Sequence, residues 1–118
     1  MDGMNTLCHL EYEVTDIARS QQFLEGMFGW TFRQFTPDMV VFGQGDTHIG
    51  GLLRVHAVKP GTSPSLWFKV ADLDAMVAKA NASGGRGEGE KSPVPGVGHS
   101  TVVYDPDGNM IGLVQYDA

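Results

Sequence analysis

The residues best suited to chemistry near the start of the chain are one histidine and two glutamates at alternate positions. His9, Glu11 and Glu13 lie in the run "TLCHLEYEV", residues 6–14. In an extended strand the side chains at i, i+2 and i+4 project from one face. That face would present an imidazole and two carboxylates, which suits a cationic or hydroxyl-rich ligand or a remodelled metal site. A solvated acidic sheet face is the alternative that this pattern leaves open.

A second set of candidates lies in the other half of the chain. Ser65 and Trp67 alternate in the run "SLWFKV". A tryptophan offers a flat, amphipathic surface for ligand stacking, although plain core packing would equally explain it. His99 follows the loop "PVPGVG" and could contact a ligand or titrate near neutral pH.

The remaining reactive residues give weaker signals. His48 and His56 are expected at the surface, and a metal pair of His9 with His48 would need a strand register that places both on one face. The single Cys8 excludes an internal disulfide and a multi-cysteine metal site. The run "GRGEGE" follows a helix stop and lacks the glycine spacing of a phosphate-binding loop.

Composition narrows the class of protein. A chain of 118 residues suits one domain or two small modules that share a core. The net charge of −6 argues against general binding to nucleic acid or to anionic membranes. The N-terminal residues show no secretory signal, and no apolar run approaches the ~20 residues of a membrane span. A cytoplasmic protein is therefore expected.

Alternation, caps and turn residues predict the elements that must position the candidates. Asp16 is expected to cap a helix that begins at Ile17 and ends at Gly29. Asp72 is expected to cap a second helix from Leu73, ended by Gly84-Gly85. The predicted strands are residues 6–14, 31–35, 39–42, 47–55, 65–70, 99–104 and 109–116.

The two halves of the chain repeat one another. "VTDI" at residues 14–17 recurs as "VADL" at residues 70–73, and each half reads strand–helix–strand–strand–strand. Such a repeat fixes the architecture. We expect a single domain of the α+β class, with module one over about residues 1–58, a linker over about 59–64 and module two over about 65–118. The two βαβββ modules would form a curved mixed sheet around a cleft.

Four segments carry a resemblance to a known family: "HLEYEVTDI", "FLEGMFGW", "VPGVGHSTVVYDPDGN" and "MIGLVQ". Together they resemble the vicinal oxygen chelate (VOC) superfamily, which includes glyoxalase I, bleomycin-resistance proteins and extradiol dioxygenases. The resemblance implies paired βαβββ modules, usually completed by a homodimer. It also implies a cleft in which four strand positions commonly hold one divalent metal.

The resemblance places those four positions on His9, Gly51, Ser65 and Gly112. Only His9 is a competent ligand, and a metal site needs three or four. Gly112 stands where the family's metal-binding, base-bearing glutamate would be. Glu13 stands where glutathione-binding members carry an arginine. The resemblance therefore implies that this chain is not glyoxalase I.

Three functions follow as expectations. The preferred one is metal-independent binding of a small aromatic or hydroxylated molecule in the cleft by His9, Glu11, Glu13, Ser65, Trp67, His99, Gly51 and Gly112, with no cofactor. The first alternative is a divalent-metal-dependent lyase, isomerase or dioxygenase with a remodelled site around His9 and Glu11. The second is a structural module with a vestigial cleft. Glycine at residues 51 and 112 is expected to enlarge the cavity, and Gly112→Glu to raise divalent-metal affinity.

Overall fold

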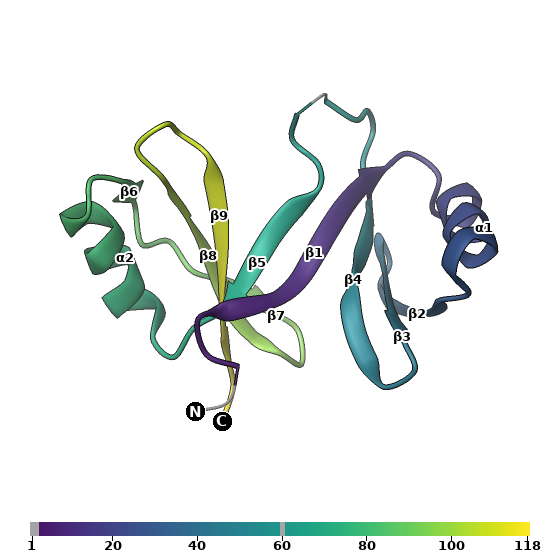
Figure 1. Cartoon of the computed structure of the whole chain (residues 1–118), viewed down its shortest axis with the longest axis horizontal. Helices are drawn as coiled ribbons and strands as arrows, with labels where there is room; N and C mark the ends of the chain where they lie inside the picture. Colours follow the sequence, from purple (N-terminus) through teal and green to yellow (C-terminus); the bar gives the residue numbers. More distant parts are fainter. Residues whose placement is uncertain (1–2, 60) are drawn as a thin grey trace. The chain divides into compact units, whose positions relative to one another are not determined.

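A computed structural model describes residues 3–59 and 61–118, which divide into two compact units. We call residues 8–65 the N-terminal unit, and residues 66–118 together with 3–7 the C-terminal unit. Figure 1 shows one helix beside the strands of each unit, α1 in the first and α2 in the second. No helix within the described ranges is long and apolar enough to cross a membrane.

The N-terminal unit is a four-stranded sheet with one helix. Its elements in chain order are β1 (Thr6–Val14), α1 (Ile17–Phe28), β2 (Thr31–Thr36), β3 (Met39–Gln44) and β4 (Thr47–Arg54). Strand β3 runs antiparallel to both β2 and β4, and β1 runs parallel to β4. Two parallel strands need a long connection between them. Here α1, β2 and β3 form the connection from β1 to β4.

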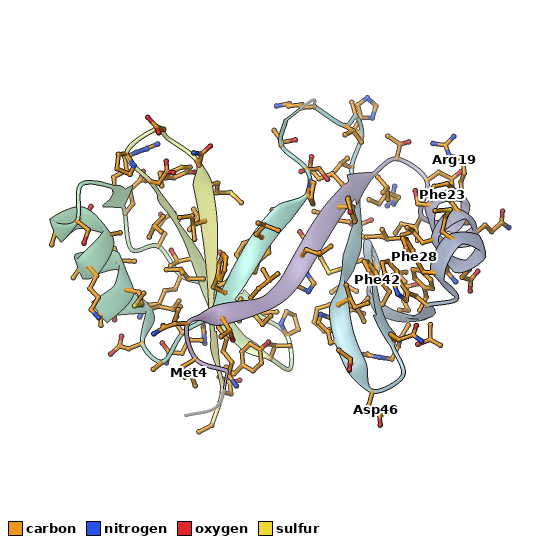
Figure 2. All side chains as sticks on the ribbon, in the orientation of Figure 1. Met4, Arg19, Phe23, Phe28, Phe42 and Asp46 are labelled. Carbon is orange, nitrogen blue, oxygen red and sulfur yellow. The ribbon has the colours of Figure 1, made fainter. Side chains whose placement is uncertain are left out.

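Both ends of α1 form as its sequence predicts. The Asp16 carboxylate accepts a hydrogen bond from the Arg19 backbone N–H at 3.1 Å, which satisfies one of the free donors of the first turn. Gly29 takes the left-handed conformation at φ 69° and closes the last turn. The apolar side chains of α1 are only partly covered, however: Phe23, labelled in Figure 2, remains 64% exposed.

An aromatic stack fixes the face of the sheet that α1 covers. Phe28 of α1 stacks on Trp30 at 4.3 Å between ring centroids, and Trp30 stacks on Phe42 of β3 at 5.0 Å. Phe32 completes this cluster from β2, and Leu52 of β4 is almost fully buried. Because side chains alternate along a strand, the neighbours of Phe42 and Leu52 present the opposite face.

The C-terminal unit repeats the order of elements with one addition. It contains β5 (Ser65–Lys69), α2 (Leu73–Ala82), β6 (Arg86–Gly87), β7 (Ser92–Val94), β8 (Gly98–Tyr104) and β9 (Met110–Tyr116). The first residue of β5, Ser65, is counted with the N-terminal unit. Strand β5 runs parallel to β9, β9 runs antiparallel to β8, and the short strands β6 and β7 both pair with β8.

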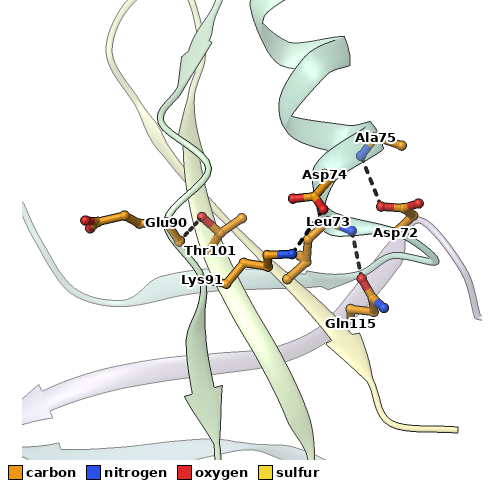
Figure 3. Close-up of polar contacts among 8 residues, drawn as sticks. All are labelled: Asp72, Leu73, Asp74, Ala75, Glu90, Lys91, Thr101 and Gln115. Atoms are coloured by element: carbon orange, nitrogen blue, oxygen red, sulfur yellow. Dashed lines mark hydrogen bonds and ion pairs between the residues drawn. The ribbon is translucent and has the colours of Figure 1, made fainter.

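Helix α2 packs on this second sheet more completely than α1 packs on the first. Its core joins Val70, Leu73 and Val77 to Val103 of β8 and Leu113 of β9. Figure 3 shows the N-terminal turn of α2, where the Leu73 N–H donates to the Gln115 side chain at 2.9 Å. The expected helices and strands and the α+β class are thus confirmed, with boundaries within a few residues of those predicted.

Candidate functional site

The face of the N-terminal unit opposite α1 carries a row of side chains of mixed charge. In register across the strands lie Glu11 of β1, Gly51 of β4, Val41 of β3 and Arg33 of β2. His9 shares this face because it lies two residues before Glu11. A carboxylate, an imidazole and a guanidinium therefore lie on one face, with a glycine in the middle that leaves room above the sheet.

His48 reaches this face through a β-bulge. Phe42 pairs with Gly50, but the next residue, Gly43, pairs with His48, so that one extra residue of β4 is left unmatched. Strict alternation from Gly50 would turn His48 toward α1, and the bulge re-aims it. Its Nε2 lies 2.8 Å from Nδ1 of His9. His48 is exposed, as expected, and the bulge supplies the strand register that places it on the same face as His9.

The two imidazoles lie edge to edge rather than stacked. Their planes differ by 11° and their centroids are 5.1 Å apart. That separation is about the distance between the two facing nitrogens plus the distance from each nitrogen to the centre of its own ring, as expected for rings that meet at their edges. His9 uses its other nitrogen, Nε2, toward Oε1 of Glu11 at 3.1 Å. An ionised carboxylate only accepts, so His9 Nε2 carries a hydrogen. With both rings neutral, His9 Nδ1 then accepts from His48 Nε2–H, and His48 Nδ1 is left as an acceptor.

The surroundings of His48 favour its neutral form. Partial burial of the ring, then the neighbouring His9 and then Arg33 hold the pKa of His48 below its ordinary value of 6.5. A shallow cavity of about 310 Å³ adjoins His48 and is lined also by Arg33, Asp46 and Thr47. This arrangement gives the cavity a neutral nitrogen base next to a guanidinium, and these groups can hold a small polar molecule.

The lowered pKa of His48 predicts a pH dependence of stability. Between its pKa in the folded chain and 6.5, the unfolded chain binds more protons, so the free energy of unfolding rises with pH in that window and falls as pH drops below about 6.5. Urea unfolding at about pH 7.5 and about pH 5.5 measures this. The wild type is expected to lose more stability on acidification than His48→Gln, and equal losses would contradict the assignment.

Glu13 is held by the segment that follows β4. Its carboxylate accepts a hydrogen bond from the Thr62 hydroxyl at 3.1 Å, and its backbone N–H donates to Ser63 at 2.9 Å. The structure therefore joins Glu13 to residues 62–63, whereas Glu11 is joined to His9. A role for Glu13 in ligand binding stays a proposal.

The face of the C-terminal unit opposite α2 is dominated by one contact. Trp67 of β5 pairs with Gly112 of β9, which pairs with Val102 of β8. A Cβ built on Gly112 would overlap Cδ2 and Cε3 of the Trp67 indole and lie 2.8 Å from its Cζ3. The benzo ring thus rests directly on the glycine backbone. The expectation that Gly112 opens space is wrong, because Trp67 fills that space.

The other two predicted positions lie elsewhere on the strands. Ser65 opens β5. His99 of β8 is exposed and pairs with Gln115, which faces α2 through its bond to the Leu73 N–H. The structure therefore does not bring His99 to the face that carries Trp67. Contacts of Ser65 and His99 with a ligand stay proposals.

A second cavity, of about 230 Å³, adjoins Trp67 in the C-terminal unit. Its lining includes Arg86, whose guanidinium carbon lies 4.1 Å from the centre of the Tyr104 ring. Sequence reasoning missed Arg86 because it follows the stop of α2 and has the pattern of a surface turn. The only available signal was its place directly after Gly84-Gly85, where a returning strand can reach β8.

The donor groups do not fit the family's metal centre. A metal needs ligands that converge on one point. Both nitrogens of His9 are instead engaged in a line from Glu11 to His48, and Gly51 faces Met39 and His9 with no donor of its own. Within residues 3–59 and 61–118, no three His, Cys, Asp or Glu side chains are grouped so that they could hold a metal ion.

Comparison with protein families and curated proteins agrees with this geometry. The family described as "Glyoxalase/Bleomycin resistance protein/Dioxygenase superfamily" matches residues 6–113. Two curated relatives, both named "Putative glyoxylase CFP32", from Mycobacterium bovis and Mycobacterium tuberculosis, are 36% identical over 78 residues. The match covers 64% of this chain but only 29% of the relatives' length.

Solved structures share the fold at low sequence identity. Methylmalonyl-CoA epimerase from Mycobacterium tuberculosis matches with a TM-score of 0.75 and 16% identity, covering 100% of this chain and 93% of that one. A glyoxalase/bleomycin resistance protein/dioxygenase superfamily member from Vibrio splendidus 12B01 matches with a TM-score of 0.69 and 21% identity, covering 93% and 99%. At these identities the likeness concerns the fold alone.

Proposed function

Because this chain belongs to the glyoxalase/bleomycin resistance protein/dioxygenase superfamily, we propose that it binds a small organic molecule without the divalent metal of the metal-dependent members. The observation that carries the proposal is the indole of Trp67, which covers Gly112 at the position of the family glutamate. A binding surface of aromatic and polar groups has taken the place of a ligand set.

The same observation argues that the chain is not glyoxalase I. That reaction needs a base near the substrate carbonyl, and neither Gly112 nor the indole above it can accept a proton. Glu13, where glutathione-binding members carry an arginine, is bonded to Thr62 and would repel the carboxylates of glutathione. The curated relatives carry the name glyoxylase, but this chain spans less than a third of their length.

A second candidate function rests on the His9–His48 pair. Two imidazole nitrogens 2.8 Å apart could both turn toward one cation if their mutual hydrogen bond were broken. This would support a metal-dependent lyase, isomerase or dioxygenase with a remodelled site around His9 and Glu11. It would require at least one further ligand, so we rank it second.

Two further features stay proposals. Self-association is supported by the exposed apolar side chains of α1, where Phe23 is 64% and Met27 60% exposed, because a second copy of the chain could cover them. A cytoplasmic location is the other.

Native mass spectrometry of the chain purified without chelators or a metal-binding tag tests these proposals together. After exposure to zinc, nickel, iron, manganese and cobalt, we expect a mass with no stoichiometric metal, and the same spectrum reports the number of chains. Near-stoichiometric metal that disappears in His9→Ala would contradict the proposal and establish the second candidate.

Binding itself is tested by thermal unfolding with a panel of aromatic and hydroxylated compounds. A ligand present at 100 times its Kd stabilises the folded chain by about 2.7 kcal/mol. For a domain of this size, that corresponds to a rise in Tm of roughly 5–15 °C. A panel that produces no such rise, together with no bound metal, would favour a structural module.

A further inference from the structure

The cavity of the C-terminal unit is small and has a fixed wall. Its volume of about 230 Å³ lies below the ~300–1,000 Å³ typical of sites for drug-sized ligands and equals roughly eight water molecules. Figure 3 shows how the wall is held: the Thr101 hydroxyl donates to the Glu90 carbonyl at 2.6 Å, and Lys91 pairs with Asp74 of α2 at 3.0 Å. The cavity suits one ring with short substituents.

Trp67 supplies a platform whose position is fixed before any ligand binds. The ring rests on Gly112, and the strands β5, β9 and β8 are in register at this point. A rigid aromatic surface gains stacking energy with little loss of side-chain freedom. One side of the ligand is therefore expected to be planar and aromatic.

Arg86 supplies the positive charge of the cavity. Its guanidinium lies over the face of Tyr104, a cation–π contact that leaves N–H groups at the edge of the guanidinium able to donate. None of the ion pairs among the described residues involves Arg86. A planar cation held in this way recognises a planar anion such as a carboxylate.

Hydroxyl and carboxylate groups complete the lining. Ser92 and Ser100, paired across β7 and β8, lie with Glu88 and Glu90 around the same space. These oxygens can accept hydrogen bonds. They favour a ligand that carries a donor group, such as a hydroxyl, separated from the carboxylate that Arg86 would bind. We infer that this cavity binds a small hydroxylated aromatic carboxylate, with Trp67 as the stacking platform and Arg86 as the group that binds the carboxylate. The inference rests on the proposed function and names its ligand class.

Three probes of nearly one shape test the inference: para-hydroxybenzoate, para-hydroxybenzamide and para-hydroxybenzamidine, which carry a negative, no and a positive charge. Affinities are measured by titration calorimetry and by the fluorescence of Trp30→Phe, in which Trp67 is the sole tryptophan. We expect the benzoate to bind about tenfold more tightly than the amide, because a charge-assisted hydrogen bond contributes about 1.5 kcal/mol or more. Arg86→Met should abolish that difference.

The matched control is Lys79→Met, which removes one positive charge from the same unit at an exposed residue of α2 that does not line the cavity. It should leave the order of affinities unchanged. If the amidine binds most tightly, or if Arg86→Met leaves the benzoate affinity unchanged, the inference is overturned while the proposed binding function survives. If none of the probes binds, the inference is overturned, and the metal measurement and the broader panel decide the proposed function.

Discussion

Gly112→Ala is expected to lower the free energy of unfolding by about 1–3 kcal/mol, the usual cost of forcing extra volume into a filled space. The added methyl group would overlap the indole of Trp67, which is held in place by the pairing of β5 with β9. Either the ring must leave its platform or the strands must separate. Equilibrium unfolding in urea, with an unchanged m-value, measures the loss.

A double-mutant cycle distinguishes this cause from a general intolerance of β9. In a Trp67→Leu background, Gly112→Ala should cost less by about 1 kcal/mol or more, because the overlapping ring is gone. The same reasoning revises the expectation for Gly112→Glu: this change should raise divalent-metal affinity only when Trp67 is also made small. Equal costs of Gly112→Ala in both backgrounds would show that the indole does not limit residue 112.

Gly50→Ala is expected to be the more damaging change, at about 3 kcal/mol or more. Gly50 lies opposite Leu10 in the parallel pair of β1 and β4, and an added Cβ would overlap the Leu10 carbonyl oxygen. A backbone oxygen cannot rotate away as a side chain can, so the two strands would have to part. Since β4 also carries His48 toward His9, loss of the His9–His48 hydrogen bond should accompany the loss of stability.

The neighbouring glycine provides a matched control. A Cβ at Gly51 would lie 3.2 Å from Sδ of Met39 and 3.3 Å from Cε1 of His9, both of which belong to side chains that can shift. Gly51→Ala should therefore cost less than about 1 kcal/mol. Denaturant unfolding measures both variants, and nitrogen-15 NMR of the imidazoles reports the hydrogen bond. Equal effects of the two substitutions would mean that the approach of β4 to β1 is not limiting.

The elements of this fold were predictable because their signals are local. Asp16 and Asp72 cap helices within three residues of the N–H groups they accept from, and alternation marks the strands without reference to distant residues. The repeat of "VTDI" as "VADL" then extended one module to two. Each inference needed only a short window of sequence.

The site was less predictable because it depends on register between distant strands. That Trp67 covers Gly112 follows from the alignment of β5 with β9, which no local pattern specifies. The contact of His48 with His9 could not be derived from alternation, because the bulge breaks the alternation along β4. The place of Arg86 beside Tyr104 likewise depends on the pairing of β6 with β8, to which its position after Gly84-Gly85 was only a weak pointer. His9 and Glu11, two residues apart on one strand, were predicted together because their relation is local.

The bulge in β4 has a consequence for how this chain is inherited and compared. Phe42 and Gly43 are consecutive, yet their partners Gly50 and His48 are not, so the neighbour of His9 depends on strand register as well as on residue type. In a descendant that kept Ile49 but lost the bulge, Gly43 would pair with Ile49 and His48 would turn toward α1. Such a descendant would keep its histidine and lose the pair, and column-by-column alignment would still score the histidine as retained. Relatives of this chain should therefore be compared by strand face, with the bulge of β4 treated as a character in its own right.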